Sequence, residues 1–528
     1  MAGNQGKPTF NLWYEDWIGV EQKDGKVIRA SIEKVLTSSD KFISLYDPSP
    51  LVIVGIHRLL VAILQASLQP KSNSDLENIW TSDCFPSEKI TEFGAKFANR
   101  FDLFSETLPF MQSVDLSLIP SKGYTRKTIA YLLPEIPAGT AVTHFSHCAD
   151  DDHIFCPACA AAGIVTLPAF ATSGGAGIKP SINGVPPLYI IPGGETLKKI
   201  LSASLLQPVF QPSKIPLSND LAWWNRDPII NRSSEVYQVG YLHSLTFAAR
   251  RLRLHPQLVN TSCTRCGSQT QWGVSTMVFE MGEWRNNDAA PWFDPFAAYR
   301  LPDNDDKKPY PIRPSEGKDT WREFSGLFLH RTEITNKKKT IRPRVLDQIA
   351  DLFSDEPDNK DTDQRKLTFR CIGMRTDMKA KVFEWIDANF EIPIHLLKDQ
   401  VLAGQEFDRA IQFADDCGGI LTNVFNRTFN ERSKNSSRFS HDRTSLHDTY
   451  WKMLAAPFRQ FILKIDVANP TQYQKDWAEN VVKIARNVFK ETMERMPDDA
   501  SNLRRRVEAE QLCTTFLTFR FKKEEFNE

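Results

Sequence analysis

Four cysteines in two closely spaced pairs are the residues of this sequence best suited to chemistry. Cys156 and Cys159 form one C-x-x-C pair, and Cys263 and Cys266 form another. This spacing lets two thiolates reach one metal ion at about 2.3 Å in tetrahedral geometry. We therefore expect a structural zinc (Zn2+) site with four cysteine ligands, which leaves no open position to activate water. The long gap between the pairs, 160–262, keeps a redox dithiol or two unrelated knuckles as alternatives.

A glycine-rich segment lies between the two pairs, at residues 172–184. Glycines allow the backbone to approach a ligand closely, and a lysine beside them adds a positive charge, which suits phosphate or a nucleic-acid groove. The segment is not a phosphate-binding P-loop, because Pro180 follows the lysine and no helical period begins there. A glycine-rich turn that binds nothing is the alternative. The candidate binding residues are Gly174, Gly175, Ala176, Gly177 and Lys179.

A cluster of histidines and aspartates just before the first cysteine pair suggests a different chemistry. His147, Asp150 and His153 could hold a catalytic metal, so a zinc-dependent nuclease or hydrolase is the competing function. Asp-rich loops are usually solvated turns, however, and no H-E-x-x-H helix accompanies this one. The sequence also has no G-x-S-x-G elbow or nucleotide-binding fingerprint. We therefore expect that the chain is not an enzyme.

A basic run near residue 340 is a candidate for contact with nucleic acid. Lys337, Lys338 and Lys339 are consecutive, and Arg342 and Arg344 follow them. Such a run neutralises several phosphates if it lies on one face, whereas the usual alternative is a solvated loop. Lys+Arg 65 balances Asp+Glu 65 over the whole chain. Any nucleic-acid site must therefore be a local patch of this kind.

Length and composition describe a folded protein. The 528 residues are 41% hydrophobic and 25% charged, which excludes wholesale disorder and collagen-like composition. The most apolar stretch, 51–64, is interrupted by His57 and Arg58 and is shorter than the roughly 20 residues that span a bilayer, so we expect no membrane association. The first residues lack an apolar signal core, so we expect a cytoplasmic chain whose nine cysteines are thiols or metal ligands.

The sequence has two regions that differ in their residue patterns. Residues 51–69 have helical spacing that Pro70 closes, but prolines and glycines are frequent from 108 to 216 and predict a loop-rich structure there. Long amphipathic patterns with few prolines begin near residue 392 and continue to about 521. We expect an α+β fold in which a large, loop-rich mixed N-terminal domain (1–390) carries the zinc site and a four-helix bundle (391–528) follows.

Several segments, taken in order along the chain, resemble the CasA family, the large subunit of the type I-E CRISPR surveillance complex Cascade. Residues 10–20 resemble its opening strand, and Pro109-Phe110-Met111-Gln112 resembles its Pro-Phe-Met-Gln element. The cysteine pairs bracket the same glycine-rich loop, and the helical C-terminal third fits the family's four-helix bundle. The resemblance covers most of the chain.

The resemblance implies a non-catalytic subunit that docks at the 5′ end of the guide CRISPR RNA beside the other Cascade subunits. Such a subunit checks double-stranded target DNA for a short adjacent motif, the PAM, and promotes strand separation and R-loop formation. Base pairing with the guide reads the rest of the target. In the family, full pairing then licenses a separate helicase-nuclease. A scaffold with no nucleic-acid contact of its own is the remaining alternative.

The resemblance also assigns roles to particular residues. The glycine-rich loop touches the PAM minor groove through its backbone, and a turn near residue 378 wedges apart the first target base pair. A lysine finger of the family has no counterpart, since no lysine occurs between Cys266 and Trp292, and Arg285 is the only cation there. Expected guide-RNA and subunit contacts are Phe145, Ser146 and His147; expected DNA contacts, besides the glycine-rich segment and Lys337 to Lys339, are Arg285, Asp377, Met378 and Lys379.

Overall fold

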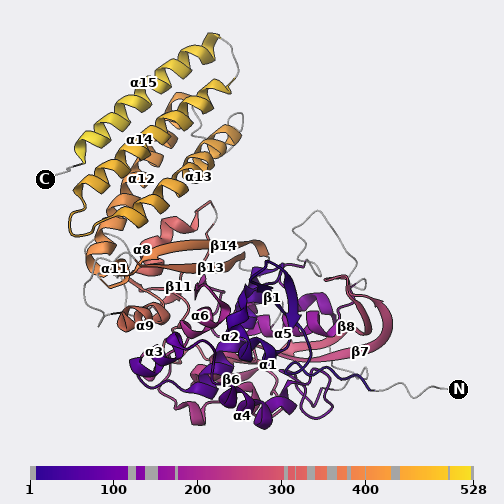
Figure 1. The fold of residues 1–528 in the computed structure, drawn as a ribbon. Helices are drawn as coiled ribbons and strands as arrows, with labels where there is room; N and C mark the ends of the chain where they lie inside the picture. The colour runs from indigo at the N-terminus through magenta and orange to yellow at the C-terminus, as the bar shows by residue number, and fades with distance from the viewer. Residues whose placement is uncertain are drawn as a thin grey trace. The chain divides into compact units, whose positions relative to one another are not determined.

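The chain folds into two compact units with mixed helical and strand structure (Figure 1). The first unit contains Met1–Pro314, Arg342–Asp355 and Leu367–Asn389, and the second contains Ser315–Ile341, Glu356–Lys366 and Phe390–Glu528. The computed structural model describes residues 7–116, 126–136, 153–172, 177–302, 307–315, 317–329, 339–353, 365–376, 382–398, 400–429, 440–496 and 500–524.

Helix α2 (Pro50–Leu68) runs through the core of the first unit. Pro50 stands at its N-terminus, where a missing N–H costs nothing, and Gln69 closes it with a left-handed φ of 46°. The helix confirms the predicted helical spacing but is longer than the apolar stretch on which we based the absence of a membrane span. It is long and apolar enough to cross a membrane, yet 83% of its most apolar window is buried inside the protein, as in a core helix.

Small sheets and short helices surround α2 in the first unit. Strand β1 lies between β2 and β3, β8 between β4 and β7, and β13 between β14 and β5, whereas β6 and β9 pair in parallel. The strands that lie wholly or mostly in this unit are β1 (Ile18–Gln22), β2 (Val27–Ala30), β3 (Phe42–Leu45), β4 (Arg126–Thr128), β5 (Tyr189–Pro192), β6 (Ser234–Val236), β7 (Arg250–Ser262), β8 (Gln269–Met281), β9 (Glu283–Arg285), β10 (Tyr299–Arg300), β11 (Tyr310–Pro311), β13 (Lys366–Thr376) and β14 (Val382–Pro393). The helices are α1 (Ile32–Thr37), α2, α3 (Asn73–Thr81), α4 (Ser87–Phe97), α5 (Pro157–Phe170), α6 (Leu197–Ser202), α7 (Tyr241–Leu245) and α9 (Arg344–Leu352).

Two elements of this unit, α5 and the β7–β8 hairpin, position the candidate site. The hairpin is a long antiparallel pair, with Arg250 opposite Met281 at its base and Ser262 opposite Gln269 near its tip. Helix α5 is buried along nearly its whole length and packs on α2, where Gly55 lies against the backbone of Val165. A side chain at Gly55 would meet that backbone at 2.6 Å, so the close approach of the two helices requires glycine.

The second unit is mostly helical. It contains β12 (Thr340–Ile341), α8 (Phe324–Phe328), α11 (Ile394–Lys398), α12 (Gln400–Phe429), α13 (Ser440–Lys464), α14 (Thr471–Glu494) and α15 (Ala500–Lys523). Long helices α12 to α15 pack on one another (Figure 1), and aromatic side chains join α12, α13 and α14. The Phe458 ring lies 6.0 Å from Phe407 and 5.5 Å from Trp477, and Trp321 packs on Phe458 at 4.7 Å, all between ring centroids. A C-terminal helical region is therefore confirmed.

Candidate functional site

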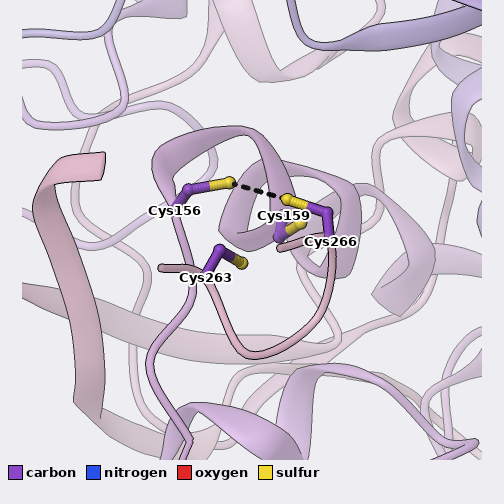
Figure 2. A group of neighbouring side chains, drawn as sticks. All are labelled: Cys156, Cys159, Cys263 and Cys266. Atoms are coloured by element: carbon purple, nitrogen blue, oxygen red, sulfur yellow. Dashed lines mark hydrogen bonds between the residues drawn. The ribbon is translucent and has the colours of Figure 1, made fainter. Parts of the chain in front are cut away.

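The four predicted cysteine ligands come together in the first unit (Figure 2). Their sulfur atoms all lie within 4.8 Å of one another, and the Sγ atoms of Cys156 and Cys266 are 3.7 Å apart. Four sulfurs at about 2.3 Å from a tetrahedral centre would stand about 3.8 Å from one another. The cluster is therefore close to the size that one metal ion requires, and thiolate sulfur suits zinc among other soft or borderline ions.

Local backbone geometry places each cysteine pair. Cys156 is the N-cap of α5 and Cys159 lies in its first turn, where the positive end of the helix dipole favours thiolate. Cys263 and Cys266 occupy the tip of the β7–β8 hairpin, in a tight turn where the N–H of Gly267 donates to the carbonyl of Cys263 at 2.9 Å. Gly267 has a φ of +74°, which other residues rarely adopt.

Backbone pairing also joins the two cysteine pairs. The N–H of Thr264 donates to the carbonyl of Ile154 at 2.8 Å, and Phe155 and Val274 exchange two hydrogen bonds at 2.9 Å each. The segment before α5 is thus an extra strand on the hairpin near its tip. This pairing explains how pairs that lie about 110 residues apart in sequence reach one centre.

The four thiols of the cluster are coupled to one another, and their pKa values shift in opposite directions. Hydrogen bonds with Cys156 and Cys263, together with burial, raise the pKa of Cys159, whereas hydrogen bonds from Cys156 and Cys159 to its sulfur lower the pKa of Cys263. The thiols by themselves thus share protons, and four thiolates need a metal ion to coexist. Arg29 interacts with Cys266, and Arg265 lies 4.0 Å from the sulfur of Cys159, so two cations offset the charge of such a centre.

The competing histidine and aspartate site receives no support from the described residues. Among them, the only group of histidines, cysteines and carboxylates close enough to hold a metal is the cysteine cluster, and His153 is not part of it. His147 and Asp150 lie outside the described residues. Four protein ligands would also fill a tetrahedral ion, so the cysteine centre is suited to structure and not to hydrolysis.

The glycine-rich segment leaves from the opposite end of α5. The chain returns to this end through Ser181, whose N–H donates to the carbonyl of Ala171 at 2.8 Å and whose hydroxyl donates to the carbonyl of Pro168 at 2.7 Å. Gly177 has a φ of +80° and open space around it, as a turn residue would. Thr172 and residues 177–184 are described, whereas Gly174, Gly175 and Ala176 lie outside the described residues.

Lys179 and Arg285, which we selected for different reasons, line one cavity of about 530 Å³. Lys179 follows the glycines of the glycine-rich segment and Arg285 ends β9, and Lys308 contributes a third cation to the wall. The ammonium of Lys179 lies over the ring of Trp284, and this cation–π contact holds the positive charge at the wall of the cavity. The cavity thus presents positive charge and aromatic surface together, a combination that suits nucleic acid.

A buried polar network lies next to this cavity and includes Asn183, one of the residues that line it. Arg58 on α2 pairs with Asp294 at 2.9 Å, and the side-chain amide of Asn183 donates to the same carboxylate at 3.1 Å. Asn183 also donates to the hydroxyl of Tyr189, which in turn donates to the carbonyl of Ala169 at the end of α5. The return arm of the glycine-rich segment is therefore tied to both core helices.

The members of the basic run differ in their exposure. Lys339 is exposed, while Lys337 and Lys338 lie outside the described residues. Arg342, in contrast, is buried and its Nε donates to Asp347 at 2.8 Å, so this member of the run is not available to a phosphate. A count of charges along the sequence could not show this, because Arg342 lies just before α9 and its partner lies in the first turn of that helix.

The remaining predicted contacts lie outside the described residues. The candidate guide-RNA residues Phe145, Ser146 and His147 belong to this group, as do the candidate wedge residues Asp377, Met378 and Lys379. The described strands on either side of the wedge residues, β13 and β14, are paired with each other. The sequence reasoning overlooked Trp284 and Lys308. An aromatic residue next to Arg285 was the available signal for Trp284, but nothing local marks Lys308.

Comparison with known proteins gives one consistent result. The family model of the CRISPR-associated protein Cse1 matches residues 11–488. A curated relative, the CRISPR-associated protein CasA/Cse1 of Thermus thermophilus, is 24% identical, and the match covers 95% of this chain and 96% of that protein.

Solved structures show the same fold. The crystal structure of the CRISPR-associated protein Cse1 from Acidimicrobium ferrooxidans matches with a TM-score of 0.78 at 20% identity, over 98% of this chain and 99% of that one. Cse1 of Thermobifida fusca matches with a TM-score of 0.77 at 20% identity, over 98% of both chains. A chain of a CRISPR RNA-guided surveillance complex matches with a TM-score of 0.71 at 18% identity, over 97% of this chain and all of that one.

Proposed function

Because the chain belongs to the Cse1 (CasA) family, the large subunit of the CRISPR surveillance complex Cascade, we propose that it checks double-stranded DNA for a PAM beside the guide RNA. In this proposal the subunit docks at the 5′ end of the guide through residues near Phe145 and against the other subunits. It reads only the short motif, and base pairing with the guide reads the remainder of the target.

The convergence of Lys179 and Arg285 on one cavity is the observation that carries this proposal. The two residues lie 106 positions apart (285 − 179), one in the glycine-rich segment after its glycines and the other at the end of β9. A backbone rich in glycine can enter a minor groove, where the arginine can read base edges and the lysine can neutralise a phosphate. Trp284 holds the lysine in place between encounters.

Recognition then leads to strand opening. Basic residues, Lys337 to Lys339 among them, supply salt-dependent sampling of duplex, and Met378 between β13 and β14 inserts as an apolar wedge at the first base pair. The guide extends the heteroduplex from that opening. Domain 391–528, arranged as a four-helix bundle, provides the surface on which a separate helicase-nuclease is recruited.

We propose that the subunit itself is not an enzyme and acts in the cytoplasm. The cysteine centre holds one structural Zn2+, which ties the start of α5 to the hairpin tip and leaves no position for a catalytic water. A zinc-dependent nuclease is the competing function. It requires metal-dependent cleavage of nucleic acid by the isolated chain, and the described residues contain no second metal-binding group to support it.

The direct test is duplex binding by the guide-loaded remaining subunits, with and without this chain, at one fixed salt concentration. We expect the chain to increase affinity for PAM-bearing target and to have little effect on PAM-scrambled target. No gain with either target would overturn the recognition role. Cleavage by the isolated chain with added Zn2+ would favour the nuclease instead.

Two variants separate the roles of the cavity residues. Arg285→Ala should relax discrimination between PAM sequences, at a cost of about 1–3 kcal/mol in binding the correct motif. Lys179→Ala should weaken binding to both targets and reduce the dependence of log affinity on log salt by about one unit. Lys214→Ala is the control, because Lys214 is exposed and does not line this cavity. Equal behaviour of all three variants would remove the cavity from the proposal.

A further inference from the structure

Arg250, the first residue of β7, makes an unusual set of contacts at the base of the glycine-rich segment. Its Nη1 donates to the carbonyl of Lys179 at 2.9 Å, and its Nη2 donates to the carbonyl of Thr172. These two carbonyls belong to residues on either side of the segment's glycines, 71 and 78 positions before the arginine in sequence. A single guanidinium therefore joins the outgoing and the returning arm.

Within the described residues, the charge of the Arg250 guanidinium is not neutralised by an ion pair, in contrast to that of Arg251 beside it. Arg251 pairs with both Glu280 and Asp115, whereas no carboxylate in the described parts of the chain forms an ion pair with Arg250. The residue is only 4% exposed, and burial lowers the pKa of its side chain to about 10. The group is still protonated at neutral pH, so a buried positive charge lies beneath the segment.

The surrounding backbone is built to bring the arginine close. Gly282, just after β8, has no room for a side chain, because a Cβ would stand 2.2 Å from the carbonyl of Ala248. This approach lets the end of β8 lie beside the start of β7, where the sulfur of Met281 accepts the N–H of Lys179 at 3.1 Å. The returning arm is thus held by its N–H and by its carbonyl.

We propose that Arg250 is a positioning residue for duplex recognition: it fixes the distance between Thr172 and Lys179, which flank the glycines, and adds a buried positive charge beside these two residues. This inference rests on the proposed function. Backbone contact with a groove depends on the position of the main chain and not on side chains. Anchoring of the flanking backbone therefore matters most in a segment of small residues, whose own side chains cannot position it. Loss of the arginine should thus affect discrimination more than capture.

Three variants test this proposal in the reconstituted, guide-loaded complex. Arg250→Met keeps the length of the side chain but removes both donors and the charge. Arg250→Lys keeps the charge and can reach one carbonyl. The control is Arg253→Met on the same strand, since Arg253 is also buried and donates to a backbone carbonyl, that of Ser105, away from the segment.

The readout is the ratio of affinities for PAM-bearing and PAM-scrambled duplex, with melting temperature and incorporation into the complex measured in parallel. We expect Arg250→Met to lower this ratio about tenfold, equivalent to about 1.4 kcal/mol, and Arg250→Lys to restore part of it. Arg253→Met should leave the ratio unchanged even where it lowers the melting temperature as much.

Two results would overturn the inference. One is an equal loss of affinity for both duplexes, which would mean that Arg250 contributes charge or stability without positioning. The other is full discrimination by Arg250→Lys, which decides the matter even if Arg250→Met does not fold. Failure of the proposed function is distinguishable, because it would be seen as the absence of PAM preference in the unsubstituted chain.

Discussion

The two ends of α5 are joined to the same hairpin by different means. At its N-terminus, Cys156 and Cys159 meet Cys263 and Cys266 at the hairpin tip, in a cluster suited to a metal ion. Near its C-terminus, Arg250 at the hairpin base donates to the carbonyls of Thr172 and Lys179, which flank the glycines of the glycine-rich segment. The first connection depends on four side chains of one type, whereas the second depends on one side chain and two main-chain carbonyls.

This contrast determines what each connection can do. A metal centre with four protein ligands is strong and closed, so it supplies stability and takes no direct part in binding. Hydrogen bonds from a guanidinium to carbonyls are weaker singly but fix direction and distance. We expect perturbation of the cysteine end to reduce stability first, and perturbation of the arginine end to reduce recognition first.

The largest effect should come from Cys156→Ser. It removes one ligand of the proposed zinc centre, which in small zinc-folded peptides contributes about 10–16 kcal/mol, so we expect the loss of one bound ion and of several kcal/mol of stability. Amide exchange should rise at Thr264 near the tip and less at Glu283 near the base, both of which donate to backbone carbonyls. Metal content, thermal melting and hydrogen exchange measure these outcomes.

Cys84→Ser is the matched control for this prediction, because Cys84 is exposed and lies outside the cluster. It should leave metal content and melting temperature unchanged. A wild-type chain that is stable and contains no metal would contradict the zinc assignment at once.

A second prediction concerns pH and the helix that supports α5 along its middle. His57 on α2 is buried, and burial, with the nearby charge of Arg58, lowers its pKa from 6.5 to about 3. The unfolded chain therefore takes up a proton below pH 6.5 that the folded chain does not, so stability is lost as the pH falls from about 6.5 toward 3. At pH 4.5 this residue alone should cost on the order of 3 kcal/mol.

His57→Gln should remove that part of the pH dependence, as seen in urea unfolding at pH 7.5 and pH 4.5. The exposed His441 provides the control, since His441→Gln should follow the unsubstituted chain at both pH values. If His57→Gln kept the full loss of stability on acidification, protonation at His57 would not be its source.

The smallest effect should come from Gly55→Ala. A methyl group there would meet the backbone of Val165 at 2.6 Å and press on the middle of α5, so we expect a loss of about 1–3 kcal/mol and faster exchange at both ends of the helix alike. Gly419→Ala in α12 should instead stabilise by up to about 1 kcal/mol, because a methyl group there meets nothing within 4 Å. The same sign for both variants would show that close packing does not govern Gly55.

The features that the sequence predicted well are those encoded by local spacing. The two C-x-x-C pairs converge as expected, and α2 and the C-terminal helices follow their apolar periods and their prolines. Arg342 illustrates the limit of this reasoning. Its position in a basic run suggested exposure, but its partner Asp347 is part of the helix that begins two residues later, and burial followed from packing that charge spacing does not record.

Arg250 could not have been identified from the sequence. Its partners are main-chain carbonyls, which every residue possesses, and they lie more than 70 positions away. The cation–π pair of Lys179 and Trp284 is hidden for the same reason, since it needs the hairpin to bring β9 beside the returning arm. Side chains that bind backbone leave no complementary residue type to search for, and only the fold reveals them.

The contacts of Arg250 with main-chain carbonyls have a consequence for how this chain can change. A guanidinium that holds Thr172 and Lys179 only by their carbonyls does not depend on the side chains between them. If the proposed function holds, substitutions within that stretch should alter which motif is accepted without loosening its attachment. Residues 173–178 can therefore be varied while α5 and the hairpin are kept constant as the scaffold. Libraries randomised at these positions should yield variants with altered motif preferences.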